Sequence, residues 1–198
     1  GLLVPVCIYS IMAVSLNLTV GILGDLSLGQ AGFMCVGAFA SAFFTNLVQD
    51  SITFTPLRFT LAILIGALVA GVFGLLIGIP VLRLSGDYLA IVTLAFGEII
   101  KNFLNILYVG KDSHGLHVSI KDTMSLGMEP DGVVIIKGAQ GITGTSRDAT
   151  FTIGIILLLI SLFIVLRLVQ SRDGRAIRSI RDNRIAAESI GINITKYK

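Results

Sequence analysis

Five long apolar stretches limit what this chain can fold into. They cover residues 3–23, 31–48, 59–79, 88–108 and 151–170. Each is close to the roughly 20 apolar residues that a helix needs to cross a bilayer. The stretches are continuous and do not alternate with period two, which excludes a β-barrel. The sequence therefore predicts an all-α integral membrane protein, a polytopic helical bundle with about five transmembrane helices.

Charged side chains are scarce, and they are segregated along the chain. Of the 198 residues, 54% are apolar and 14% are charged, and the mean hydropathy is +0.90. Soluble domains carry about a quarter charged residues. This composition excludes a soluble enzyme and a disordered chain. Only Glu98, Lys101 and Arg167 place a charge inside the five stretches.

The charges of the connecting segments predict the topology. Residues 171–198 hold seven Lys or Arg against three Asp or Glu, and such a bias marks the cytoplasmic side. Residues 24–30 and 80–87 are then also inside, and 49–58 and 109–150 are outside. We expect a transmembrane domain over 1–170, with a long extracytoplasmic loop at about 109–150, and a cytoplasmic helical region over 171–198. Because the chain begins inside a span and stops in a polar helix, we expect it to be truncated at both ends.

Small residues recur on one face of several predicted spans. In the third span they are four residues apart, a spacing that lets neighbouring backbones come close. Similar faces occur in the first span, where Asn17 lies among small residues, and in the second. Three such faces indicate a tightly packed bundle. The third-span residues expected in helix packing are Gly66, Ala70, Gly74 and Gly78.

Glu98 and Lys101 lie three residues apart near the middle of the fourth span, and therefore on one helix face. A charge at mid-bilayer costs roughly 2.5–3.5 kcal/mol, so we expect this face to point into the bundle or toward water. The pair is either part of a translocation path or a structural ion pair. Asn102 extends the polar face, and Asn17 of the first span is a further candidate for the path.

No pattern in the sequence indicates covalent chemistry. The glycine-rich stretch 138–144 lacks the lysine of a phosphate-binding loop. His114 and His117 are too few for a closed metal site. Cys7 and Cys35 lie inside spans and form no disulfide framework. We therefore expect a protein that is not an enzyme, with no catalytic residue, no metal and no cofactor bound by this chain.

The cytoplasmic region combines two helical patterns. Arg175, Arg178 and Arg181 are three apart, while Ile177, Ile180, Ala187 and Ile190 form an apolar strip. Gly191 suits the left-handed cap that follows a helix. The pattern predicts a short amphipathic helix ending near residue 190. It serves either as a basic anchor on anionic headgroups or as a docking helix in the groove of a partner.

Four stretches together resemble a known family. They are GDLSLGQAGF at 24–33, continuing through GAF at 37–39; LRLSGDYLAIVTLAFGEI at 82–99; the glycine-rich loop; and residues 174–193, which run from GRA to IAAESIGIN. The chain resembles the LivM-type permease subunits of bacterial ATP-binding-cassette importers for branched-chain amino acids. Residues 1–170 would then be the permease domain and 171–198 the coupling region.

The resemblance assigns a role to the cytoplasmic helix. Permeases of such importers carry an Ala-Ala-x-x-x-Gly core that docks in a cleft of the ATPase subunit. Ala186, Ala187 and Gly191 match this core, whereas the glutamate that commonly precedes it is Ile185 here. The residues that the resemblance implies in coupling are Arg178, Arg181, Asp182, Ala186, Ala187, Glu188 and Gly191.

The resemblance also implies partners and a location. These are a second permease subunit in a heterodimer, two ATP-binding subunits that use the ATP, an extracytoplasmic substrate-binding protein and the lipid bilayer, but no nucleic acid. The protein would be a multi-pass protein of the bacterial inner membrane that translocates leucine, isoleucine and valine. Permeases of this architecture also serve urea, short amides or other amino acids. Two competing functions of a different class are an ion-coupled secondary transporter that uses Glu98 and a purely structural membrane subunit.

Overall fold

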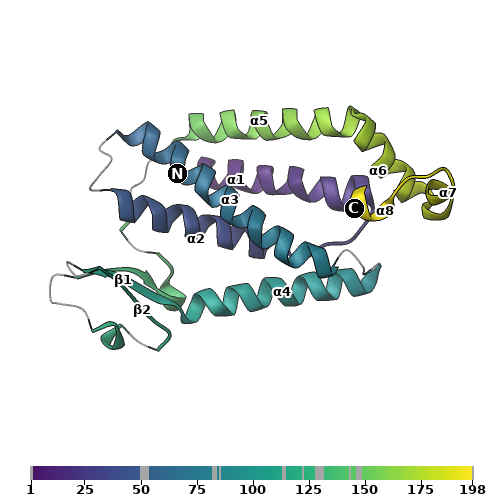
Figure 1. The fold of residues 1–198 in the computed structure, drawn as a ribbon. Helices are drawn as coiled ribbons and strands as arrows, with labels where there is room; N and C mark the ends of the chain where they lie inside the picture. Colours follow the sequence, from purple (N-terminus) through teal and green to yellow (C-terminus); the bar gives the residue numbers. More distant parts are fainter. Residues whose placement is uncertain are drawn as a thin grey trace. The chain divides into compact units, whose positions relative to one another are not determined.

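Five long helices make up most of the described part of the chain. The computed structural model describes residues 2–49, 54–81, 84, 86–112, 115–121, 123–127, 132–142, 144–145 and 149–197. The long helices are α1 (Leu3–Leu16), continued by the π-helix η1 (Asn17–Leu23), then α2 (Gln30–Val48), α3 (Thr55–Val81), α4 (Asp87–Ile106) and α5 (Phe151–Gln170) (Figure 1). In this part of the chain, five helices are long and apolar enough to cross a membrane. The predicted polytopic helical membrane protein is confirmed.

The observed helix ends differ from the predicted spans mainly in α3. This helix starts at Thr55, four residues before the predicted span, so that Arg58 lies within its first turns. Pro80 lies in its last turn, and the helix ends one residue later. Proline removes a backbone donor and is poorly accommodated inside a helix, which explains why α3 ends directly after it.

The chain folds as two compact units, each assembled from separate stretches. Unit 1 comprises Gly1–Gln30, Gly78–Leu94 and Ala149–Lys198. Unit 2 comprises Ala31–Ile77 and Ala95–Asp148. Unit 1 therefore contains the polar helices that follow α5, and unit 2 contains most of α2, α3 and α4.

Within unit 1, α1 and α5 pack along each other, and a glycine of α5 lies at their contact. Cys7 of α1 is buried, with 6% of its surface exposed. A Cβ atom on Gly154 of α5 would lie 3.1 Å from the Cys7 Cβ and 3.2 Å from its Sγ. The glycine thus lets the two helices approach closely, as small residues do between membrane helices.

The first span changes its helical form before it ends. Residues Asn17–Leu23 form a π-helix, and Gly24, with φ +82°, ends it. The Asn17 side chain lies directly over Gly21, where no side chain is present. A π-helix is rare and is often found at functional sites.

Within unit 2, glycines allow α2 to approach both α3 and α4. A Cβ on Gly66 of α3 would lie 2.7 Å from the Gly37 carbonyl oxygen of α2. A Cβ on Gly32 of α2 would lie 2.9 Å from the Gly97 Cα of α4. Since both neighbours are backbone atoms, neither helix pair could accept alanine without moving apart.

The predicted long loop at 109–150 contains a small antiparallel sheet, which the sequence analysis missed. Its strands β1 (Tyr108–Asp112), β2 (Gly115–Ser119) and β3 (Val133–Lys137) have the order β2-β1-β3. The sheet is joined to the end of α4, because the Gly138 N–H donates to the Leu107 carbonyl at 3.0 Å. Val109, Ile135 and Ile136 form the buried core of this region.

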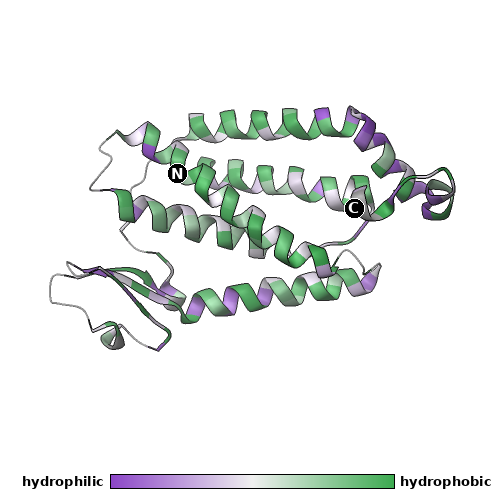
Figure 2. Cartoon of the chain, in the orientation of Figure 1, coloured by the Kyte–Doolittle hydropathy of each residue, from purple (hydrophilic) through white to green (hydrophobic). Residues whose placement is uncertain are grey.

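The predicted amphipathic helix of the C-terminal region is wrong in one respect: it is not continuous. The structure has α6 (Arg172–Asp182), α7 (Arg184–Ser189) and α8 (Ile194–Tyr197). Asn183 separates α6 from α7 with an extended backbone, φ −155° and ψ 105°. Figure 2 shows mostly hydrophobic residues along α5 and hydrophilic residues at the start of α6.

Candidate functional site

Helix α6 is fixed to the end of α5 by a closely packed joint. The Ser171 Oγ accepts a hydrogen bond from the Gly174 N–H at 3.1 Å and so caps α6. A Cβ on Gly174 would collide with the carbonyl oxygens of Leu168 and Val169. The absence of a side chain at Gly174 therefore lets α6 turn sharply out of α5.

Two arginines of α6 bind the last carbonyl groups of α5. Arg175 Nη1 donates to the Gln170 carbonyl at 3.2 Å, and Arg178 Nη2 donates to the Val169 carbonyl at 3.0 Å. Carbonyls in the last turn of a helix have no partner within the helix. Arginine near this end both satisfies them and complements the negative end of the helix dipole.

A third arginine of α6 contacts the first span. Arg181 Nη1 donates to the Gly21 carbonyl of η1, 160 residues away in the sequence. The stem of the same side chain lies against Gly24, where a Cβ would be 2.9 Å from the Arg181 Cγ. The close approach and the left-handed backbone at Gly24 both favour glycine there.

Helix α7 begins and ends with recognisable caps. The Asn183 Oδ1 accepts a hydrogen bond from the Ala186 N–H at 3.0 Å. Gly191 follows the helix with φ +86°. This confirms the predicted left-handed cap. The Gly191 N–H donates to the Glu188 carbonyl at 3.0 Å. Both ends of this short helix are therefore fixed by hydrogen bonds of their own.

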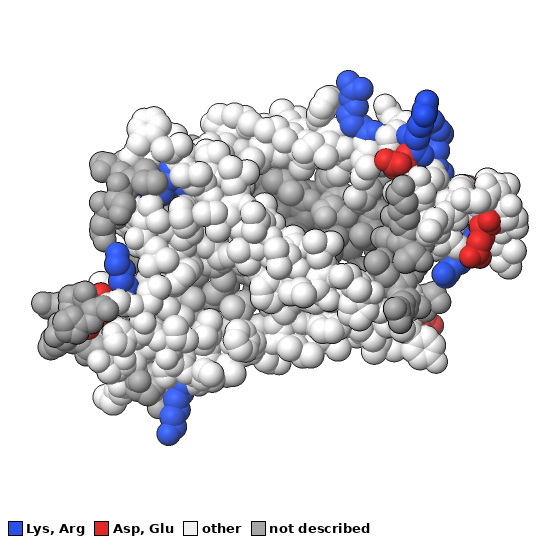
Figure 3. Space-filling view, viewed as in Figure 1, with Lys and Arg blue, Asp and Glu red and all other residues white. Residues whose placement is uncertain are grey.

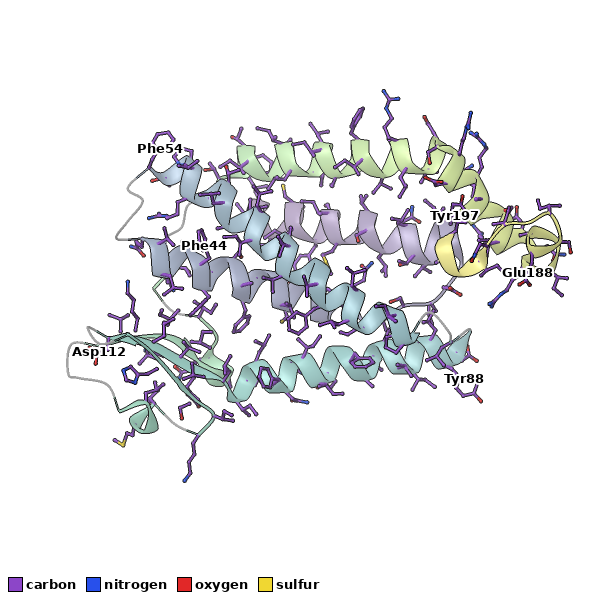
Figure 4. All side chains as sticks on the ribbon, viewed as in Figure 1. Phe44, Phe54, Tyr88, Asp112, Glu188 and Tyr197 are labelled. Carbon is purple, nitrogen blue, oxygen red and sulfur yellow. The ribbon has the colours of Figure 1, made fainter. Side chains whose placement is uncertain are left out.

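The two faces of α7 have different surroundings. Ala187 is 2% exposed and packs with Ile180 of α6 and Ile194 of α8. Ile185 and Ile190 are 78% and 75% exposed. Figure 3 shows Lys and Arg side chains over the end of α5 and over α6 and α7, and Figure 4 labels Glu188 on α7, at the tip of this segment. The exposed face of α7 thus carries small and branched apolar side chains, and charged side chains lie around it.

Comparison with known proteins gives the family. The profile described as "Branched-chain amino acid transport system / permease component" matches residues 1–198. This chain belongs to that family. It is 33% identical, over 96% of its length, to the high-affinity branched-chain amino acid transport system permease protein LivM of Salmonella typhimurium and to the protein of the same name in Escherichia coli.

The chain spans 45% of the length of each of these curated relatives. The resemblance inferred from the sequence is confirmed at the level of the family. No solved structure matches the chain significantly.

The first two of the four stretches that resemble the family, at 24–33 and 82–99, contact each other within unit 1. The Leu28 N–H donates to the Thr93 Oγ1 at 3.1 Å, and this hydroxyl donates to the Ala90 carbonyl at 3.0 Å. A Cβ on Gly29 would lie 2.9 Å from the Thr93 carbonyl oxygen. Buried Thr93 therefore holds the segment that follows η1 against the first turns of α4. Residues 82, 83 and 85 of the second motif lie outside the described residues.

The polar residues proposed for a translocation path belong to different units, with Glu98, Lys101 and Asn102 in unit 2 and Asn17 in unit 1. Lys101 Nζ and Glu98 Oε1 form an ion pair at 2.9 Å, with side chains 58% and 57% exposed. Asn102 is exposed on the same helix, and Asn17 is exposed in unit 1 apart from its contact with Gly21. The pairing of Glu98 with Lys101 neutralises both charges locally.

In the described residues, only part of the small-residue face of α3 contacts a neighbouring helix. Gly66 and Ala70 lie against Gly37 of α2, where a Cβ on Gly37 would be 3.5 Å from the Ala70 Cβ. Among the described residues nothing lies within 4 Å of a Cβ placed on Gly74 or on Gly78. The packing role of these last two glycines stays a prediction.

Unit 2 holds an apolar cavity of about 410 Å³. Aromatic side chains of three helices line it, together with Val109 and Ile136 of the sheet, and every lining residue is apolar. Such a surface can bind hydrocarbon groups, but it offers no side-chain partner for an amino or carboxylate group. The aromatic lining residues are Phe39, Phe43, Phe73 and Phe103.

Sequence reasoning missed Arg58 and the π-helix. Arg58 is 7% exposed, and the Thr55-Pro56 pair before it could have placed the helix start correctly, because proline is favoured in the first turn. No sequence signal marks η1. His114 lies outside the described residues, and in the part of the chain that the structure covers no three His, Cys, Asp or Glu side chains are grouped to hold a metal.

Proposed function

We propose that this chain is part of the permease subunit of an ATP-binding-cassette importer for branched-chain amino acids. The family and the names of the two relatives support the transport role. The proposed assembly contains a second permease subunit in a heterodimer, two ATP-binding subunits and an extracytoplasmic substrate-binding protein. The proposed location is the bacterial inner membrane, with α6–α8 on the cytoplasmic side and the sheet on the outer side.

The observation that carries the proposal is the exposed face of α7. Ile185 and Ile190 leave large apolar side chains uncovered on a helix that Ala187 holds firmly to its neighbours. An amphipathic helix with an uncovered apolar face is suited to a groove in a partner protein. We assign this face, with Ala186, Glu188 and Gly191, to docking in a cleft of an ATP-binding subunit.

In this proposal the chain carries out no covalent chemistry. ATP is bound and hydrolysed by the partner subunits, and this chain binds no cofactor of its own. Its task is to convert the movement of the ATP-binding subunits into alternating access of the spans.

The test is uptake of labelled leucine by cells with and without the full-length gene, before and after ATP depletion. We expect gene-dependent uptake that stops when ATP is depleted. Unchanged leucine uptake on deletion would refute the substrate and direct the assay to urea, amides or other amino acids. Gene-dependent uptake that survives ATP depletion but stops when the ion gradient collapses would refute the ATP-driven importer in favour of an ion-coupled carrier.

A further inference from the structure

The arginines of α6 form a row that serves the ends of two membrane helices. Arg175, Arg178 and Arg181 are spaced at i, i+3 and i+6, so they lie along one side of α6. The first two donate to the carbonyls of Gln170 and Val169 in α5. Arg181 alone donates to a different span, at Gly21. The row therefore connects α6 to the ends of both α5 and the first span.

The acceptor of Arg181 belongs to the irregular part of the first span. Gly21 lies in η1, close to its end at Leu23, where backbone carbonyls lack helical partners. A guanidinium group bonded to such a carbonyl is charge-assisted and also complements the negative helix end. The contact is therefore stronger than one between two neutral groups.

Arg181 contacts η1 and leaves an open cavity next to the contact. Gly24 gives the arginine stem a flat surface, because a Cβ there would be 2.9 Å from Cγ. A cavity of about 140 Å³ lies next to the contact, lined in part by Asp25, Arg184 and Ile194. The first span therefore has an irregular helical form at Asn17–Leu23, and an open cavity lies beside its end.

We propose that Arg181 is a positioning residue that transmits movement of α6 and α7 to the inner end of the first span through η1. The inference rests on the proposed function, since α7 must receive movement from an ATP-binding subunit. Arg175 and Arg178 fix α6 to α5, so that α6 turns with the fifth span. Through Arg181, the first span moves together with α5 and α6.

The experiment uses the full-length permease, reconstituted in proteoliposomes with its second permease subunit, ATP-binding subunits and binding protein. ATP hydrolysis and leucine uptake are measured together in the wild type, Arg181→Gln and Arg172→Gln. Arg172 provides the matched control, because it is exposed on the same helix and its loss removes the same charge. We expect leucine transported per ATP to fall about tenfold in Arg181→Gln, as for loss of a hydrogen bond to a charged group. Arg172→Gln should match the wild type.

A second readout separates transmission from a merely structural role. Leu26, 46% exposed just after η1, is replaced by cysteine in a cysteine-free background and labelled with a water-soluble maleimide. In the wild type we expect the labelling rate to change when a non-hydrolysable ATP analogue is added. In Arg181→Gln this dependence on nucleotide should disappear, whereas a structural defect would alter the rate equally with and without nucleotide.

The outcomes are distinct. If Arg181→Gln matches Arg172→Gln in both readouts, the inference is wrong while the proposed function stands. If the wild type shows no ATP-dependent leucine uptake, the proposed function fails and the inference fails with it. If Arg181→Gln does not assemble, Arg181→Lys carries the test, because lysine keeps the charge and one donor. We then expect a loss of coupling of about threefold, and wild-type coupling in that variant would overturn the inference.

Discussion

Helices α6 and α7 are neighbours in the chain, yet they differ in composition and in what their side chains contact. Helix α6 is rich in arginine, and three of those arginines bind carbonyl groups of their own chain. Helix α7 is richer in small and apolar residues, and two isoleucines next to or within it are more than 70% exposed. The charged helix thus faces the spans, and the apolar one presents an uncovered surface.

The comparison separates two tasks that a single amphipathic helix would have to combine. Arginine is suited to binding helix ends through several rigid donors. Small and branched apolar residues are suited to close contact between a helix and a groove. If this division is correct, substitutions in α6 and at its joint should affect stability and coupling, and substitutions in α7 should affect partner binding.

The largest effect is expected at the joint that directs α6. Replacing Gly174 by alanine places a Cβ against two backbone carbonyls, at Leu168 and Val169, which cannot rotate away. We expect the free energy of unfolding to fall by about 3 kcal/mol, in the range of overpacking. The midpoint of thermal denaturation of the purified complex in detergent reports this loss of stability.

The matched control for this joint is Gly71→Ala in α3. Among the described residues nothing lies within 4 Å of a Cβ at Gly71. Alanine also has the higher helix propensity, so the midpoint of denaturation should stay the same or rise slightly. Equal midpoints for the two alanine variants would contradict a tightly packed α5–α6 joint.

A smaller effect is expected at the end of α7. The φ of +86° at Gly191 costs a β-branched residue about 1–3 kcal/mol, so Gly191→Val should distort the docking turn. We expect the protein to reach the membrane in normal amounts, while ATP hydrolysis becomes uncoupled from uptake. Gly191→Asn, which tolerates a left-handed backbone, is the control. Normal uptake by the valine variant would show that this turn does not take part in coupling.

The exposed isoleucines test the contrast between the two helices directly. Ile185→Asn should leave thermal stability unchanged, because the side chain is 78% exposed. We expect capture of the ATP-binding subunits to weaken about fivefold to tenfold, as for truncation of an apolar interface residue. Ile180→Ala is the contrast, since this buried residue packs on Ala187 and its loss should lower stability. Unweakened capture by Ile185→Asn would remove α7 from the interface.

The smallest effect is expected at the ion pair of α4. Exchanging the charges in Glu98→Lys/Lys101→Glu keeps the two charges paired across the same turn, so leucine uptake should stay within about twofold of the wild type. Glu98→Gln alone leaves Lys101 unpaired inside the span, so it should lower uptake more than the exchange does. Abolished uptake in the exchanged variant, with normal amounts in the membrane, would return these residues to the translocation path.

Much of the fold could be predicted from the sequence. The five apolar stretches specify the long helices, because a helix is the simple way to satisfy backbone groups in lipid. The glycine cap at Gly191 was also predictable. The N-cap at Asn183 could have been predicted as well, since asparagine is a favoured N-cap. The run of four branched residues at 133–136 could likewise have indicated β3.

Other features depend on contacts that local patterns do not encode. The π-helix of the first span has no sequence signature that we recognise. The close approach of Gly32 to Gly97 and of Gly66 to Gly37 depends on which helices become neighbours. A four-residue spacing of small residues indicates that a face can pack, but it does not say which members will have a neighbour.

The spans, the segment where basic residues gather and the family all follow from the order of amino acids. What the basic residues bind does not follow from it. An arginine row at helical spacing is equally compatible with lipid headgroups, a partner protein or the carbonyls of its own chain, because all three can offer acceptors to a guanidinium group. Only the fold brings Gly21 to Arg181 across 160 residues of sequence. The direction of a charged side chain is set by the acceptor nearest to it in space, which no local pattern specifies.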